Sequence, residues 1–101
     1  MKQADSVAEL TGLARQVADI YAKRFGIDQN PTWYLGKMTE ELGEVRAAYL
    51  KFSGQGRGEA SLRDLEEEVA DLFGFLLLFA QWQGIDPAAA LQRKWEPYLQ
   101  D

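Results

Sequence analysis

Apolar residues recur at helical spacing along almost the whole chain, and no segment alternates polar and apolar residues with a period of two. Spacings of three and four place side chains on one face of an α-helix, whereas a half-buried strand needs the alternation. The sequence therefore predicts an all-α protein. Its 101 residues are close to the commonest domain size and carry no repeat, so we expect a single domain over residues 1–101.

Capping residues and helix breakers divide the chain into four helices. The start signals are Ser6 with Glu9, Asn30 with Pro31, Ser61 with Asp64, and Asp86 with Pro87. The stop signals are Gly26, the three glycines of residues 53–59, Gly84 and Pro97. We expect helices over residues 7–25, from 31 to about 52, from 61 to about 83, and from 88 to about 95.

Composition excludes several kinds of chemistry. The chain has no Cys and no His, which removes disulfides, thiolate metal sites, cysteine nucleophiles and His-dependent triads. A net charge of −5 disfavours a broad nucleic-acid-binding face. The most apolar run, residues 72–80, is shorter than the ~20 residues that span a bilayer, and residues 1–5 show no targeting signal. We expect a soluble, cytoplasmic protein that binds neither nucleic acid nor membrane.

Two acidic pairs lie on the second and third helices, namely Glu41 with Glu44 and Glu68 with Asp71. Each pair is spaced by three residues and shares a helix face. The short connection predicts an antiparallel hairpin, in which each pair lies roughly 10–16 Å from the loop at 1.5 Å per residue. Four facing carboxylates would repel one another, and a divalent cation relieves that repulsion. Oxygen-only ligands favour Mg²⁺ or Mn²⁺ and leave Ca²⁺ open.

The alternative is a solvated acidic face, which is common on surface helices and which suits Glu66 and Glu67. Two features favour a site instead. Basic partners are scarce, since Lys37 and Arg46 are the nearby bases on the second helix. In addition, Glu68 and Asp71 lead directly into the apolar run.

The acidic residues also form two ordered motifs. Glu40, Glu41 and Glu44 read Glu-Glu-x-x-Glu, and after 23 intervening residues Glu68 and Asp71 read Glu-x-x-Asp. Further matching positions are Lys37-Met38-Thr39, Gly43, Ala70-Asp71-Leu72, Gly84-Ile85-Asp86, Ala90-Leu91 and Lys94. Over about residues 30–95 the chain resembles the MazG-like family of all-α nucleoside triphosphate pyrophosphohydrolases.

This resemblance implies a four-helix chain with a central antiparallel helix hairpin, assembled into an oligomeric helical bundle. It implies Mg²⁺-dependent hydrolysis of a (deoxy)nucleoside triphosphate to the monophosphate and pyrophosphate, with clearance of unwanted nucleotides as a role. The implied metal ligands are Glu41, Glu44, Glu68 and Asp71, and Glu40 would lie behind them or orient the attacking water. Related phosphoribosyl-ATP pyrophosphohydrolases place Tyr-His after the Asp, where this chain has Phe73-Gly74, which argues against that role.

Four further residues are candidates for substrate binding. Lys37 shares a face with Glu41 and either contacts a phosphate or pairs with that acid. Trp33 and Tyr34 either stack on a nucleobase or belong to the core. Lys94 matches the late Lys of the family and would contact phosphate, although the residues after it, Trp95-Glu96-Pro97-Tyr98, depart from the family pattern.

The run at residues 72–80 is apolar on nearly all sides, so a single hairpin with two flanking helices cannot easily cover it. We therefore expect a homodimer or a dimer of dimers, with the second and third helices in a shared bundle. The alternative to an enzyme is a non-enzymatic helical oligomerisation module whose acids keep it soluble. A di-iron bundle would need Glu-x-x-His motifs, which a chain without His lacks. Base and sugar preference cannot be read from this pattern.

Overall fold

Each α-helix begins at a polar side chain that accepts a hydrogen bond from a backbone N–H in the first turn. Ser6, Asn30, Ser61 and Asp86 accept from the N–H groups of Glu9, Trp33, Asp64 and Ala89 at 2.9–3.1 Å. At the third helix the bond is reciprocal, since the Ser61 N–H donates to the Asp64 carboxylate at 2.8 Å. These bonds satisfy donors that have no partner within the helix, which explains why the predicted start signals work.

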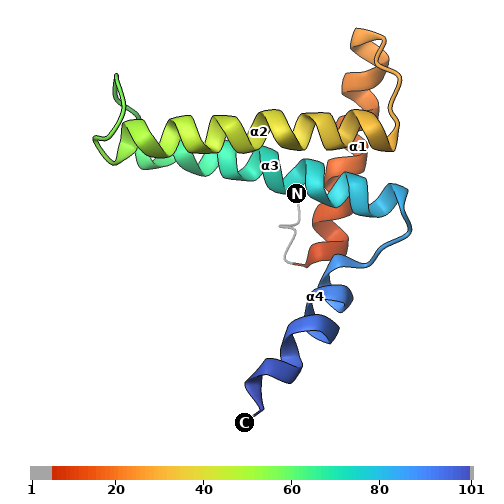
Figure 1. Cartoon of the computed structure of the whole chain (residues 1–101). Coiled ribbons are helices and arrows are strands. Elements are labelled where there is room, and N and C mark those ends of the chain that lie inside the picture. The colour runs from red at the N-terminus through yellow and green to blue at the C-terminus, as the bar shows by residue number, and fades with distance from the viewer. Residues whose placement is uncertain (1–5, 101) are drawn as a thin grey trace.

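The structure, a computed structural model, describes residues 6–100. Its helices are α1 (Val7–Phe25), α2 (Pro31–Phe52), α3 (Leu62–Trp82) and α4 (Pro87–Trp95), followed by the short 3₁₀ helix η1 (Glu96–Leu99) (Figure 1). The described residues contain no strand, so the all-α prediction is confirmed. Residues 1–5, on which the prediction of no targeting signal depends, and residue 101 lie outside the described residues.

Helix ends follow the sequence signals. Gly26 ends α1 in the left-handed conformation at a φ of 65°, which glycine adopts without steric cost. Helix α4 ends at Trp95, as Pro97 predicts. The chain then continues as the 3₁₀ helix η1, whose first turn accommodates Pro97 because a proline there needs no N–H partner.

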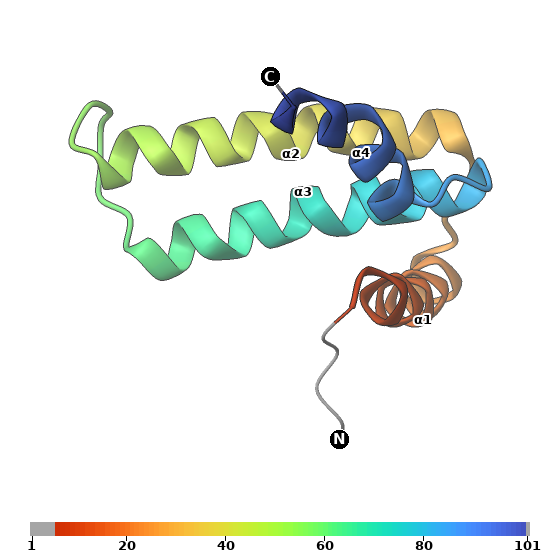
Figure 2. The ribbon, with the colours of Figure 1, turned by 90° about the horizontal axis from the view of Figure 1, so that it is seen from below.

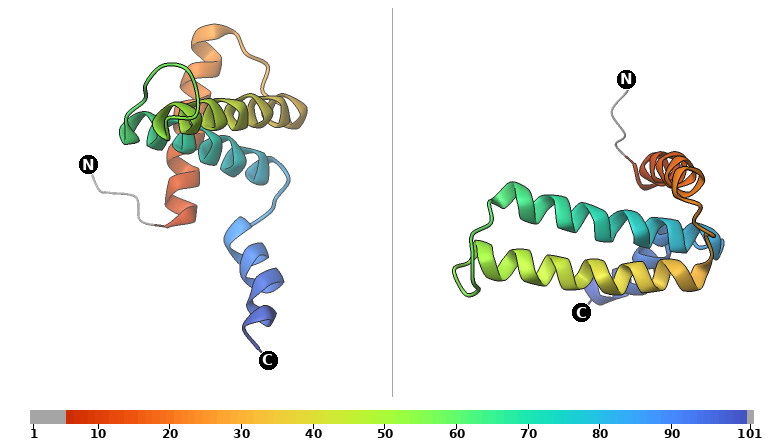
Figure 3. Two further views of the ribbon diagram at one scale, coloured as in Figure 1. Left: turned by 60° about the vertical axis from the view of Figure 1, so that its left-hand side comes forward. Right: turned by 90° about the horizontal axis from the view of Figure 1, so that it is seen from above.

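Helices α2 and α3 lie side by side and run in opposite directions, joined by residues 53–61 (Figure 2). Helix α1 crosses them and packs mainly on α3, as two further views show (Figure 3). The contacts of α4 are chiefly with η1, and this pair extends away from the other helices (Figure 1). Three helices therefore form the packed body, and the C-terminal segment projects from it.

The core is small and lies where the three long helices meet. Tyr34 is fully buried, and its ring lies 5.1–6.4 Å from the rings of Trp33, Phe75 and Trp82. The other buried apolar residues are Ala22, Ala48, Leu77, Leu78 and Ala80. Within the apolar run of α3, Phe73 and Leu76 remain 41% and 40% exposed. The chain by itself thus leaves part of its most apolar helix uncovered. None of the helices in residues 6–100 is both long and apolar enough to cross a membrane.

Candidate metal centre

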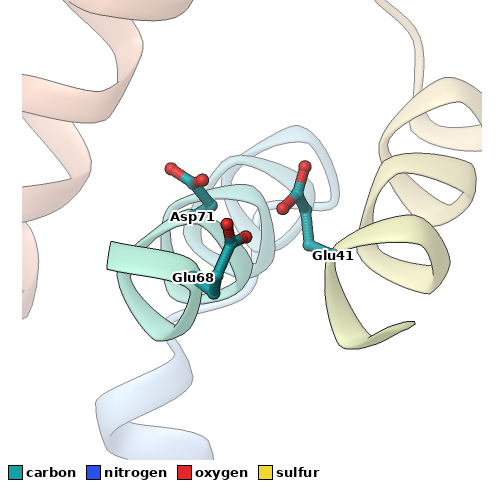
Figure 4. Close-up of side chains that lie close together, drawn as sticks. All are labelled: Glu41, Glu68 and Asp71. Carbon is teal, nitrogen blue, oxygen red and sulfur yellow. The ribbon is translucent and has the colours of Figure 1, made fainter. Parts of the chain in front are cut away.

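Three carboxylates from two helices converge on one point of the α2–α3 pair. Glu41 comes from α2, and Glu68 and Asp71 come from one face of α3 (Figure 4). One carboxylate oxygen of each lies within 4.8 Å of those of the other two. The spacing of three on α3 places Glu68 and Asp71 side by side, and the neighbouring helix supplies the third group. This is an all-oxygen donor set of the kind that Mg²⁺, Mn²⁺ and Ca²⁺ use.

The electrostatics of the three groups reflect their proximity. The pKa of Glu41 is raised above its usual value by partial burial and by the charges of Asp71 and Glu68, and Lys37 opposes this only in part. The pKa of Glu68 is raised by loss of solvation and by the charges of Asp71 and Glu44. Within residues 6–100 no Lys or Arg forms a salt bridge with any of the three. The donor set therefore fits a divalent cation, which would supply the missing positive charge.

The other two predicted carboxylates lie beside this group. Glu44 is exposed and outside the set of three, although its charge raises the pKa of both Glu41 and Glu68. Glu40 is also exposed, and its carboxylate lies 3.5 Å from the Lys37 ammonium. Lys37 thus pairs with Glu40, whereas the sequence analysis considered a pair with Glu41.

A groove of about 710 Å³ runs between α1 and the α2–α3 pair, and the acidic cluster borders it. Glu41 and Asp71 contribute to its lining, together with Trp33, Lys37 and Phe75. The Lys37 ammonium lies 5.9 Å from the centre of the Trp33 ring and 5.7 Å from that of Phe75, within range of a cation–π contact. The groove therefore places the Lys37 cation and several aromatic rings beside the acidic cluster.

Tyr34 takes a different position from the one expected for a base-stacking residue. Its side chain is fully buried, so its ring is not available to a ligand, and the core interpretation holds. Its hydroxyl donates to the side-chain oxygen of Gln29 and accepts a bond of 2.9 Å from Arg15. Trp33, its neighbour, lines the groove and is the accessible aromatic candidate.

The buried Tyr34 hydroxyl belongs to a polar network that the sequence pattern does not indicate. Arg15 also donates to Gln29, and the amide of Gln29 donates to Asp19 at 3.1 Å. The Nε of Arg15 lies 3.2 Å from the same Asp19 oxygen, close enough for ionic attraction but without hydrogen-bond geometry. The bonds that join Arg15 to Gln29 and Tyr34, and Gln29 to Asp19, span 10–19 positions, so no local spacing could have indicated them. Arg15 and Asp19, by contrast, are four residues apart on α1.

Lys94 lies on α4, in the projecting segment, and is not among the residues that line the groove. The chain therefore does not bring its predicted late phosphate ligand to its own acidic cluster. Comparison of the chain with protein-family models, curated proteins and solved structures found no match.

Proposed function

We propose that this protein is a Mg²⁺-dependent nucleoside triphosphate pyrophosphohydrolase of the MazG-like kind. The observation that carries the proposal is the convergence of Glu41, Glu68 and Asp71 from two helices, with no salt bridge to a Lys or Arg within residues 6–100. The three acids follow one another along the chain in the same order as in the two motifs on which the resemblance to the MazG-like family rests. In this proposal the α2–α3 pair is the central hairpin of a MazG-like domain, and Mn²⁺ is an alternative metal.

The proposed site divides its tasks among few residues. Glu41, Glu68 and Asp71 would hold the metal, with Glu44 completing the set from the next turn of α2. When bound, Mg²⁺ neutralises phosphate oxygens and acidifies a coordinated water. Glu40 would orient the attacking water, Lys37 would contact a phosphate oxygen, and Trp33 would stack against the base. Because Glu40 pairs with Lys37, substrate binding must separate the two or use them together.

We also propose that the active form is a homodimer or a dimer of dimers in the cytoplasm. Support comes from the exposed apolar residues of α3, of which Val69 is 48%, Phe73 41% and Leu76 40% exposed. A shared bundle would remove these side chains from water. The same exposed surface favours the second candidate function, a helical oligomerisation module without catalysis.

The two functions differ in two measurements. The enzyme is expected to gain thermal stability from millimolar Mg²⁺ and to release pyrophosphate from a panel of canonical and modified nucleotides. Hydrolysis in ¹⁸O-labelled water is expected to place the label in the monophosphate, because water attacks the α-phosphorus. Absence of both the metal response and pyrophosphate release would leave the oligomerisation module.

A further inference from the structure

The chain exposes far more surface than a folded monomer of its size. Its accessible surface is 7969 Å², whereas a compact 11.4 kDa protein exposes about 5,800 Å². Its radius of gyration is 15.9 Å, against about 13 Å for a compact chain of 100 residues. The excess of roughly 2,200 Å² matches the ~1,000–2,500 Å² that each partner buries in an obligate dimer. The dimensions therefore favour a second copy of the chain as the partner that covers this excess surface.

Helix α1 presents a large part of this excess. It buries only an alanine, Ala22, among its described residues. On the neighbouring face, Leu13, Val17, Ile20 and Tyr21 are 47–60% exposed, and we refer to these four residues as the α1 stripe. Their spacings of three and four make the stripe continuous along about 12 Å of helix. Three of its members line the groove that also contains Glu41 and Asp71.

The second uncovered surface is the C-terminal arm, which we define as α4 and η1, residues 87–99. Its apolar side chains are Leu91, Trp95, Tyr98 and Leu99, which are 51–85% exposed and border one concave surface. From Leu91 to Leu99 this surface extends about 14 Å at helical rises. Its length therefore matches the α1 stripe, yet the arm points away from the body of its own chain (Figures 1 and 3).

Charged residues lie on and beside the apolar surface of the arm. Glu96 borders the surface itself, Lys94 is three residues after Leu91 and lies to its side, and Arg93 is two residues after Leu91 and faces away from it. The groove beside the α1 stripe carries Glu41 and Asp71, whose negative charge would attract a neighbouring cation.

We propose that the C-terminal arm of one copy docks on the α1 stripe of a second copy and brings Lys94 to the edge of that copy's groove. The exchange covers two apolar surfaces that each chain leaves open. It also adds, in trans, a second cation to the groove that Lys37 of the same chain already lines. The assignment of Lys94 to a phosphate rests on the proposed function, whereas the docking of the arm does not.

Cross-linking tests the docking without any substrate, and a chain with no native Cys is suited to it. A tagged Val17→Cys chain is mixed with an untagged Tyr98→Cys chain in a glutathione redox buffer. We expect a covalent heterodimer to form at least several-fold faster than with the control Arg93→Cys, which lies on the opposite face of the arm. Trp95→Asp in the Tyr98→Cys chain should suppress the reaction.

Four outcomes would overturn the docking. They are equal rates for positions 98 and 93, preferential pairing of two Val17→Cys chains, closure within one chain when both cysteines share it, and a monomer at micromolar concentration. Equal rates would mean that the contact is unspecific, and pairing of two Val17→Cys chains would mean that α1 contacts α1. Closure within one chain would mean that the arm folds back, and a monomer would mean that the α1 stripe serves another partner.

Complementation tests the role of Lys94. The variants Lys94→Ala and Glu41→Gln are each expected to be impaired in pyrophosphate release. In a mixed dimer, a site in trans combines Glu41 of one chain with Lys94 of the other. Random exchange would then restore about a quarter of wild-type activity, since half the dimers are mixed and each has one intact site. No restoration would mean that Lys94 acts within its own chain or not at all. A wild-type protein that releases no pyrophosphate would refute the proposed function and leave the cross-linking result standing.

Discussion

At the level of single residues, the three carboxylates of the acidic cluster lie close together although their negative charges repel one another. Glu41, Glu68 and Asp71 lie close enough to raise the pKa values of the two glutamates, and no basic side chain in residues 6–100 pairs with them. Groups in this state reduce the stability of the folded chain when they ionise. Two predictions follow from this cost, and a third concerns catalysis.

Removal of one charge should stabilise the metal-free protein. Glu41→Gln is expected to raise the melting temperature by a few degrees, since relief of one like-charge contact is worth about 1 kcal/mol. The same substitution should abolish the stabilisation by Mg²⁺. Differential scanning fluorimetry with and without Mg²⁺ measures both, and Glu66→Gln, an exposed neighbour on α3, is the control. A variant that loses stability but keeps its Mg²⁺ response would show that Glu41 is structural.

The pH dependence of stability has a defined sign. Since the pKa of Glu41 is higher in the folded chain than its ordinary value of 4.5, the folded state takes up a proton first as the pH falls. The free energy of unfolding should therefore increase as the pH is lowered from neutral through the raised pKa, and this gain is complete near pH 4.5. Urea unfolding in EDTA at several pH values measures it. The gain should shrink in Glu41→Gln, and an undiminished gain there would assign it to other groups.

The hydrolysis should depend on the three carboxylates of the acidic cluster and not on every acidic residue nearby. Glu68→Ala is expected to lower the rate of pyrophosphate release by about two orders of magnitude or more, because it removes a group that holds the charge-stabilising metal. Glu66→Ala, two residues away and exposed, should leave the rate nearly unchanged. Comparable losses in both variants, measured by steady-state kinetics, would contradict the assignment.

At the level of the helices, the position of α1 depends on a polar network around a buried tyrosine. Arg15 of α1, Gln29 of the following loop and Tyr34 of α2 bond to one another, and Arg15 also reaches Gln81 of α3 at 3.5 Å. Partly buried polar groups of this kind favour one arrangement because each alternative leaves a group without a partner.

Loss of the Tyr34 hydroxyl should therefore weaken the attachment of α1. Tyr34→Phe is expected to lower the free energy of unfolding by about 1–3 kcal/mol, since it leaves the partly buried Arg15 and Gln29 side chains with fewer hydrogen-bond partners. Hydrogen exchange in α1 should accelerate at the same time. Tyr49→Phe, at a tyrosine that is 49% exposed, is the matched control. Equal effects of the two substitutions would exclude a special role for the network.

At the level of the whole molecule, apolar surface is distributed over too many faces for one chain to cover. The exposed residues of α3, the α1 stripe and the C-terminal arm lie on three different elements. Their combined exposure and the extended dimensions of 50 × 40 × 32 Å support the proposed assembly.

The assembly should depend on Leu76. Leu76 is 40% exposed and does not take part in the ring contacts that Phe75 makes in the core. Leu76→Glu is therefore expected to reduce the molar mass in light scattering toward 11.4 kDa while the helical circular dichroism persists. Thr32→Glu, an equal change of charge at an exposed site in α2, should leave the molar mass unchanged.

Local structure could be read from the sequence because its causes are local. Ser6, Asn30, Ser61 and Asp86 cap helices through bonds that span only three residues, and the spacing of three puts Glu68 and Asp71 on one face. Pro97 likewise marks the end of α4 at Trp95, and the chain continues directly in the 3₁₀ helix η1.

Contacts between helices could not be read in this way. Helical periodicity states which side chains share a face but not which other helix will cover that face. The burial of Tyr34, the bond from Arg15 to it, the position of Glu44 outside the set of three and the separation of Lys94 from the groove all depend on how α1, α2, α3 and α4 are placed. That placement is set by packing and hydrogen bonds between residues far apart in the chain, which leave no trace in local spacing.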